Sequence, residues 1–230
     1  MRGTPVLMTV IGLGCAAPAA TPFDAGPPPD LGADYATGDY VVPAGTTLTP
    51  FLSDTPVRQF DGAGMALTPG RDYFAVLETD VGRVVLDLLE VETPLATNSF
   101  VWLALHHYYD GIAFHRVIAD FVAQGGDPNS LRADHTTWGL GGPGYGFATE
   151  PAPGLTFDGA GAVGMARTAD PNSNGSQFFI TLAATHQLDG QYTLFAHVTE
   201  GLDVLPHIVR GEPPVTPTRM LRVYIADKAR

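Results

Sequence analysis

The sequence predicts a mainly β fold, a closed antiparallel β-barrel of eight strands capped by two α-helices. Two observations predict it. Short segments with strand-like alternation recur along the chain from Tyr73 onward, and between them only two segments show the spacing of apolar residues that is typical of a helix. Many short strands with few helices are typical of a closed antiparallel sheet, in which no strand edge is left unpaired.

The first two strands are expected to form a hairpin. Alternation runs from Tyr73 to Thr79 and again from Arg83 to Leu89, and Asp80-Val81-Gly82 supplies the turn between them. After Pro94, apolar residues recur near helical spacing until Asp110-Gly111, which predicts a helix of about three turns. The apolar side of this helix should cover one end of the sheet.

The rest of the barrel is expected from shorter segments with the same alternation. These strands are placed at Ile112–Val117, Phe121–Ala123, Ala162–Arg167, Gln177–Leu182, Thr193–Val198 and Met220–Ala226. A second helix is expected near Gly201–Val209. Together these elements place the folded domain at residues 72–230.

The residues before the domain divide into three segments. Residues 1–15 carry one positive charge at Arg2, an apolar run from Val6 to Leu13, and a small residue before Cys15, which is the layout of a short export signal. The run is shorter than the ~20 residues that cross a bilayer. Residues 16–44 are rich in Ala, Pro, Gly and Asp and predict a flexible linker, whereas residues 45–71 form an N-terminal extension whose structure the sequence leaves open.

The segment that ends at Cys15 resembles a bacterial lipoprotein signal, so Cys15 is a lipidation candidate. That resemblance implies attachment to a membrane through acyl chains on Cys15 and a position in the cell envelope, facing the periplasm. The alternative is a disordered N-terminus with an incidental cysteine, in a cytoplasmic protein. Gly12 stands where such signals usually carry Leu, and Arg2 is the single basic residue before the apolar run.

The amino-acid composition argues against several classes of binding partner. Lys and Arg number 12 against 24 Asp and Glu, giving a formal net charge of −12. This charge repels phosphate backbones and argues against a nucleic acid partner, and it supplies no polybasic patch for anionic lipid. A single cysteine excludes an intramolecular disulfide and a cysteine-based zinc cluster. The domain is expected to be monomeric.

Two motifs imitate ligand sites without completing them. Residues 139–144 match the letters of a dinucleotide fingerprint, but no strand precedes them and Pro143 would break the helix that must follow, so a glycine-rich loop is expected. Residues 170–175 imitate the start of a calcium loop, whose twelfth position would be Thr181 instead of a bidentate Glu. His106 and His107 are adjacent on a helix and point apart, so solvated or capping roles are expected. No metal site is predicted.

Four motifs follow one another in the C-terminal two thirds of the chain. They are FHRVI at 114–118, FVAQGGDP at 121–128, MARTADPNSNGSQFFITL at 165–182 and LDGQYTLFAHV at 188–198. In the order and spacing of these motifs, the chain resembles the cyclophilin family from Tyr73 onward. The residues of the third motif are most similar to those of prokaryotic members. The resemblance implies a cyclophilin-like fold and peptidyl-prolyl cis-trans isomerase activity on proline-containing polypeptides, without metal or cofactor.

The resemblance also implies the site residues, position by position. Arg116 matches the catalytic arginine, and Gln124 matches the residue that binds the substrate backbone. The proline pocket is expected from Phe121, Val122, Phe179, Leu188 and Tyr192, and peptide binding from Ala166, Arg167 and Gln177. His115 is expected to be structural. A surface Arg paired with an acid is the alternative reading of Arg116 taken alone.

The chemistry suits these residue types. Rotating an X-Pro bond breaks no covalent bond but crosses a barrier of ~18–20 kcal/mol. In the twisted state the imide nitrogen gains a lone pair, which a guanidinium can stabilise. Val122, Gln187 and Tyr192 depart from common family residues, and we expect weak cyclosporin binding. The alternative function is a non-catalytic proline-peptide-binding envelope lipoprotein or chaperone module.

Overall fold

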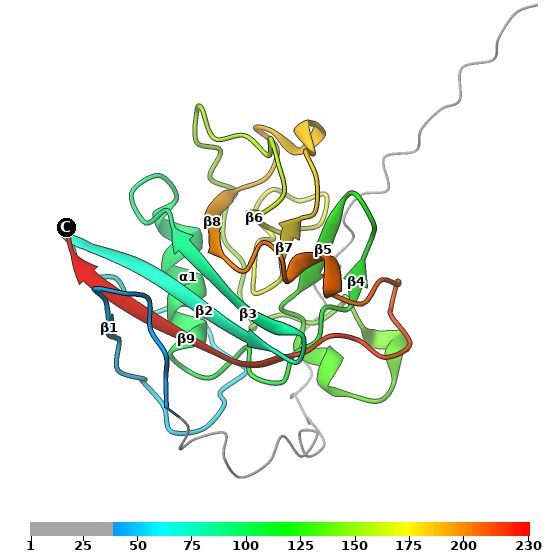
Figure 1. Cartoon of the computed structure of the whole chain (residues 1–230), viewed down its shortest axis with the longest axis horizontal. Helices are drawn as coiled ribbons and strands as arrows, with labels where there is room; N and C mark the ends of the chain where they lie inside the picture. The colour runs from blue at the N-terminus through cyan, green and yellow to red at the C-terminus, as the bar shows by residue number, and fades with distance from the viewer. Residues whose placement is uncertain (1–38) are drawn as a thin grey trace, which may run out of the picture.

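The computed structural model describes residues 39–230, so the predicted signal segment and most of the predicted linker, including Cys15, lie outside the described residues. Nine strands form one sheet in the order β1-β9-β2-β3-β8-β6-β7-β5-β4 (Figure 1). The strands are β1 (Thr47–Leu48), β2 (Arg71–Thr79), β3 (Gly82–Leu88), β4 (Arg116–Val117), β5 (Val122–Gly125), β6 (Ala162–Met165), β7 (Phe178–Thr181), β8 (Leu194–Glu200) and β9 (Met220–Ala229).

The predicted hairpin is confirmed as β2 and β3. Thr79 lies opposite Gly82 in the antiparallel register, and the Thr79 hydroxyl donates to the Gly82 carbonyl at 2.6 Å. Gly82 has a φ of +144°, and a Cβ there would lie 2.7 Å from a Val204 methyl. Glycine therefore fits this turn for both its backbone conformation and its missing side chain.

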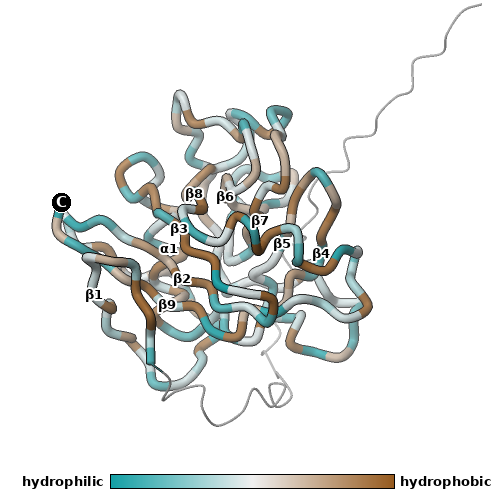
Figure 2. The backbone as a smooth tube through the Cα atoms, in the orientation of Figure 1, coloured by the Kyte–Doolittle hydropathy of each residue, from teal (hydrophilic) through white to brown (hydrophobic). Residues whose placement is uncertain are grey.

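Closure of the sheet into an eight-stranded barrel is not confirmed. The ladder is open, with β1 at one end of the strand order and β4 at the other. Isolated bridges join Ala113 to Arg219 and Val117 to Gly211, so the chain around β4 contacts the chain before β9 without forming a continuous ladder. Figure 2 shows hydrophobic stretches along the central strands and hydrophilic residues in many connecting loops.

Among the described residues the fold has one α-helix, α1 (Pro94–Ala104), so the prediction of two is wrong. Proline opens α1, and the Glu150 carboxylate accepts from the amides of Leu95 (3.0 Å) and Ala96 (2.7 Å), which satisfies two of the donors that a helix start leaves free. The expected second helix is a short 3₁₀ turn, Leu205–His207. Pro206 lies within it and lacks the amide that a longer helix would use.

Other short 3₁₀ turns lie at Pro128–Leu131, His135–Thr137 and His186–Leu188. No helix of the described part of the chain is long and apolar enough to cross a membrane.

Three clusters of buried apolar residues form the interior of the described chain, and the smallest, Val76, Val85 and Tyr224, packs against Leu48 and Phe51. The main core places α1 against the sheet, with Phe100 stacked on Tyr109 at 4.7 Å and edge-on to Phe178 at 5.5 Å. A second cluster, called the side cluster below, lies between β5, β6, β7 and β8. Its buried members are Val122, Phe157, Ala162, Ala166, Phe179, Leu188 and Leu194, with Leu89, Phe121, Leu155 and Tyr192 half-buried against them.

Residues 39–70 pack on the domain. They include the end of the predicted linker, residues 39–44, and the extension whose structure the sequence left open. β1 pairs with β9 near the C-terminus of the chain, with Thr47 opposite Asp227 (Figure 1). Farther along, the amide of Leu52 donates to Leu105 at 2.8 Å and the amide of Phe60 donates to Pro143 at 2.8 Å. These backbone bonds reach both the end of α1 and the glycine-rich loop.

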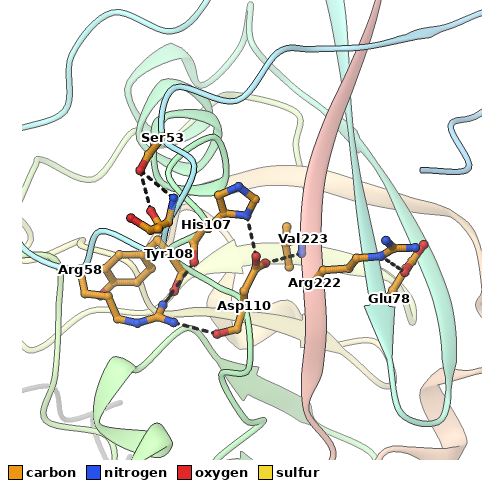
Figure 3. Close-up of polar contacts among 9 residues, drawn as sticks. Ser53, Arg58, Glu78, His107, Tyr108, Asp110, Arg222 and Val223 are labelled. Carbon is orange, nitrogen blue, oxygen red and sulfur yellow. Dashed lines mark hydrogen bonds and ion pairs between the residues drawn. The ribbon is translucent and has the colours of Figure 1, made fainter. Parts of the chain in front are cut away.

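A buried arginine fixes this extension to the end of α1. The Arg58 guanidinium donates to the carbonyl of Tyr108 and, at 2.9 Å, to the carbonyl of Asp110 (Figure 3). The Asp110 carboxylate in turn accepts from the Val223 amide at 2.7 Å and contacts His107 Nδ1 at 2.8 Å. We call these five residues the Arg58 cluster. They join the extension, the chain after α1, and β9.

The two adjacent histidines after α1 are not solvated. His106 Nδ1 lies 2.7 Å from the Trp102 carbonyl in the last turn of the helix, which is a capping contact. His107 has a φ of +54°, and its ring stacks on Phe51 of the extension at 4.1 Å. The expected capping role is therefore supported for His106, whereas His107 packs on Phe51 and contacts the Asp110 carboxylate.

Candidate functional site

Strand register places the predicted site residues in one row. Arg116 lies opposite Gln124 across β4 and β5, and Gln124 lies opposite Phe179 across β5 and β7. The row continues to Gly164 on β6. Directly opposed residues of antiparallel strands project from the same face of the sheet. A Cβ at Gly164 would overlap the ring of Phe179, so glycine leaves room for that ring to lie across β6.

The polar end of the row leaves one donor and one acceptor unused. Arg116 Nε donates to Glu212 Oε2 at 2.8 Å, while Arg116 Nη1 is buried and has no hydrogen-bond partner among the described residues. Gln124 Nε2 donates to Gln177 Oε1 at 3.0 Å, while Gln124 Oε1 is likewise buried without a partner. A peptide group, which offers both an acceptor and a donor, has the chemistry to complete both.

The orientation of Gln124 depends on the glycine-rich loop. Gln177 Nε2 donates to the carbonyls of Gly139 (3.0 Å) and Gly141 (2.8 Å), which directs Gln177 Oε1 to Gln124. The buried Asp127 carboxylate accepts from the Gly139 amide and holds this loop, and a Cβ at Gly141 would overlap Asp127 Oδ1. Burial raises the pKa of Asp127 to about 6, against hydrogen bonds from backbone amides that lower it. Residues 139–144 are a loop, as expected.

His115 lies beside the loop as a neutral group. Its side chain is 4 % exposed, and burial, followed by the charge of Arg116, lowers its pKa to about 4. Gln177 lies near the ring and partly opposes this lowering of the pKa. Neither ring nitrogen, however, has a hydrogen-bond partner of good geometry among the described residues. Since the ring is uncharged at neutral pH, His115 supplies no proton to the site there.

The apolar end of the row is the side cluster. All five residues predicted for the proline pocket belong to it, namely Phe121, Val122, Phe179, Leu188 and Tyr192, together with the predicted peptide-binding residue Ala166. Phe179 sits centrally, 5.5 Å from the Phe157 ring and 5.9 Å from Tyr192, edge-on to the latter. Phe121 and Tyr192 are partly exposed, so they form the part of the cluster that faces solvent.

The remaining predicted residue, Arg167, lies at the rim of the side cluster. Its guanidinium carbon is 4.7 Å from the centre of the Tyr192 ring. Arg167 Nη2 donates to the Gln191 carbonyl at 2.7 Å, and Nη1 donates to the Thr168 carbonyl at 2.8 Å. Arg167 therefore stabilises the Tyr192 segment in this structure, and its predicted contact with a peptide stays a prediction.

Three residues that contribute to the candidate site were not predicted from the sequence. Glu212 is 96 positions from Arg116, and no motif connects them. Phe157 comes from a loop without strand alternation. Asp127 lies within the FVAQGGDP motif, but no role was predicted for it. An aromatic residue in a long loop was the one available signal for Phe157. Within residues 39–230, no group of three or more His, Cys, Asp or Glu side chains is arranged to hold a metal ion.

The chain is similar to a known protein family and to proteins of other organisms. Residues 74–225 match the family model described as cyclophilin type peptidyl-prolyl cis-trans isomerase/CLD. Peptidyl-prolyl cis-trans isomerase-like 1 of Mus musculus is 42% identical over 156 residues, covering 64% of this chain and 89% of the mouse protein. The Rhizopus delemar protein of the same name is 47% identical over 133 residues, covering 56% of this chain and 76% of its own length.

A solved structure of a cyclophilin-type isomerase has a similar fold. The crystal structure of a Cryptosporidium parvum cyclophilin type peptidyl-prolyl cis-trans isomerase, determined in the presence of the dipeptide Ala-Pro, superimposes with a TM-score of 0.60 at 30% identity. The match covers 66% of this chain and 98% of that chain. The three named relatives are eukaryotic, so they do not support the expected similarity to prokaryotic members. The extension at residues 39–70 lies outside the match to the family model.

Proposed function

The chain belongs to the cyclophilin-type peptidyl-prolyl cis-trans isomerase family, and from this premise we propose that Arg116 stabilises the twisted X-Pro bond of a polypeptide whose proline binds at the side cluster. The activity is that of a peptidyl-prolyl cis-trans isomerase. In the proposed mechanism the residues of this chain perform it without a metal or a cofactor.

Arg116 supplies the donor. Unaided isomerisation takes tens to hundreds of seconds because the amide must lose its conjugation to rotate. As it twists, the imide nitrogen gains a lone pair, and a guanidinium N–H aimed at that lone pair stabilises the transition state more than either planar state. The buried, unpaired Arg116 Nη1 is the single observation that carries this proposal.

Gln124 and the side cluster hold the substrate. Gln124 Oε1 would accept from a backbone amide of the peptide, since it has no partner among the described residues. The apolar surroundings of Phe179 would remove water from the prolyl carbonyl, and a carbonyl without bonds to water favours the twisted amide. Support comes from the Cryptosporidium parvum relative, whose crystal structure was determined in the presence of Ala-Pro. Accelerating a ~100 s process to ~1 ms requires about 7 kcal/mol.

Arg116→Ala tests the donor. We expect kcat/KM for a proline-containing peptide to fall by roughly 10²–10³-fold, the usual effect of removing one preorganised donor, with an unchanged circular dichroism spectrum. Arg83→Ala, which removes a partly exposed arginine of β3 that pairs with Glu200 outside the row, is the control and should keep full activity. A protease-coupled assay measures both. Full activity in Arg116→Ala would contradict the proposed role.

The second candidate is a module that binds proline-containing segments without turning them over. Val122 favours it, because this side chain is fully buried in the side cluster and is shorter than the Met that many cyclophilins carry there. Calorimetry with a proline-containing peptide, paired with the isomerase assay, separates the two functions. Binding that Phe179→Ala abolishes, together with no acceleration by the wild-type protein, would favour this candidate.

We also propose that the protein is attached to a membrane of the cell envelope through acyl chains on Cys15. The proposal rests on the short apolar run that precedes Cys15. One acyl chain gives only marginal attachment, so stable anchoring requires two or more. Mass spectrometry of the mature N-terminus is the test. A chain that begins at an acylated Cys15 is the expected result, and an intact Met1 would contradict it.

A further inference from the structure

A loop from a distant part of the chain reaches the catalytic arginine. Gly211 forms an isolated bridge with Val117, the neighbour of Arg116, through hydrogen bonds of 2.8 and 3.0 Å. Gly211 has a φ of +148°, and a Cβ there would lie 2.6 Å from Pro214 Cα. Only glycine fits this conformation and this space. The bridge therefore fixes the residue after it, Glu212, next to β4.

The loop that carries Glu212 is constrained along its length. At its base the Thr218 hydroxyl accepts from the Val209 amide at 3.1 Å, and the Thr218 carbonyl accepts from the Phe114 amide at 2.9 Å. Three prolines fix φ within it, at positions 213, 214 and 217. Pro214 is buried. A loop tied at its base and stiffened by proline presents its side chains in a defined position.

Glu212 contacts one edge of the Arg116 guanidinium. Its Oε2 accepts from Arg116 Nε at 2.8 Å, and its side chain is 54 % exposed, against 22 % for Arg116. A guanidinium is planar, so an acceptor at Nε limits the rotation of the whole group and thereby sets the directions of the Nη donors. Arg116 Nη1 is the buried donor without a partner among the described residues, and Arg116 lies opposite Gln124 in the strand register.

We propose that Glu212 is a positioning residue for catalysis, which holds the Arg116 guanidinium so that Nη1 is aimed at the substrate before the substrate binds. The inference rests on the proposed isomerase function. Restricting a long side chain in the free enzyme means that less rotamer freedom is lost in the transition state. Glu212 itself is not a catalytic residue, because it acts through Arg116.

A graded series of substitutions tests the proposal. Glu212→Ala removes the acceptor and should lower kcat by roughly two- to fivefold, the scale of a partly exposed ion pair, with KM little changed. Glu212→Gln keeps an oxygen that can accept from Nε and should show a smaller loss. Glu212→Arg repels Arg116 and should show the largest loss.

The matched control is Glu200→Gln, because Glu200 pairs with Arg83 in an ion pair of similar exposure, 52 % and 31 %. It should leave kcat unchanged. The same melting temperature in all variants would show that the losses do not arise from unfolding. Equal kcat in the wild-type protein and in Glu212→Ala would overturn the proposal while leaving the isomerase function intact.

A second readout does not depend on turnover. In ¹⁵N NMR, the Arg116 Nε–H signal of the wild-type protein should be shifted and protected from exchange with water by the bond to Glu212. Glu212→Ala should abolish both effects, and Glu200→Gln should abolish neither. An unprotected Arg116 signal in the wild-type protein would overturn the positioning role. An inactive wild-type protein with a protected signal would instead contradict the proposed function, and the positioning role in catalysis with it.

Discussion

Arg58 and Arg116 are two inward-directed arginines that differ in how completely the fold uses their hydrogen bonds. Arg58, 8 % exposed, donates from Nη1 and Nη2 to the carbonyls of Tyr108 and Asp110. Arg116 pairs through Nε with a half-exposed carboxylate and keeps a buried Nη1 without a partner among the described residues. Arg58, whose donors are used within the chain, stabilises the fold, whereas the unpaired donor of Arg116 belongs to the row of candidate site residues and can serve a ligand.

The neighbours of the two arginines differ in the same way. In the Arg58 cluster, the Asp110 carboxylate is bonded to His107 and to the Val223 amide. Next to Arg116, neither ring nitrogen of His115 has a partner of good geometry. A buried polar group that stays unpaired costs free energy of folding. The candidate site therefore lowers the free energy of unfolding, whereas the Arg58 cluster raises it. Changes in pH and single substitutions should reveal these opposite contributions.

The largest expected effect comes from His115 in acid. Its pKa is lowered to about 4 in the fold, from an ordinary 6.5. As pH falls from 6.5 to 4, the unfolded chain binds a proton that the native chain does not, so His115 costs about 3 kcal/mol of the free energy of unfolding over that window. Urea denaturation at pH 7 and pH 4.5 should show a smaller acid loss in His115→Leu than in the wild-type protein. Equal losses would contradict this assignment.

Asp127 should act in the opposite direction. Its pKa is raised to about 6, from an ordinary 3.8. Between pH 4 and pH 6 the native chain keeps a proton that the unfolded chain has released, so stability falls as pH rises through this window, by up to about 3 kcal/mol. Asp127→Asn should remove this dependence and show a steeper acid loss than the wild-type protein in the same urea titrations. An unchanged pH profile in Asp127→Asn would show that the carboxyl does not titrate there.

Arg58→Met should separate stability from activity. The substitution leaves two buried carbonyls without their donor, at a cost of about 2 kcal/mol in the free energy of unfolding. We expect kcat/KM to stay within about twofold, in contrast to Arg116→Ala, since the carbonyls that Arg58 bonds belong to the chain after α1. Urea denaturation and the isomerase assay measure the two quantities, with Arg83→Met as the control at a partly exposed arginine. A large loss of activity without a loss of stability would contradict the structural role assigned to Arg58.

The sequence could predict the parts of the fold whose signals are local. Alternation from Tyr73 to Thr79 was enough for β2, and the pattern after Pro94 was enough for α1. The segment Gly201–Val209 has helical spacing, but Pro206 removes an amide there and a 3₁₀ turn forms. The packing of residues 39–70 depends on distant partners, such as the carbonyl at Tyr108 for Arg58, and no local pattern reveals those.

The candidate site shows the same limit. Arg116, Gln124 and Phe179 come from motifs that the family shares, and the strand register brings them into one row. Glu212 joins them only because Gly211 bridges to Val117 across almost a hundred positions of sequence. A bridge of this kind is set by tertiary packing, which leaves no repeating signal in a single sequence.

Arg167 is the last and smallest test of the comparison, because it lies at the site and yet has its bonds completed within the chain. Its guanidinium donates to the Gln191 and Thr168 carbonyls and lies over the Tyr192 ring. Like Arg58, it should therefore support the fold instead of the chemistry. Removing a partly exposed cation–π contact costs about 0.5–1 kcal/mol, so Arg167→Met should raise KM by roughly two- to fivefold through a displaced Tyr192 and leave kcat unchanged. Tyr192→Phe, which keeps the ring, should change neither constant by more than about twofold, and steady-state kinetics on one peptide measures both variants. A fall in kcat for Arg167→Met would mean that completed hydrogen bonds do not distinguish the structural arginines of this protein from Arg116, the proposed catalytic one.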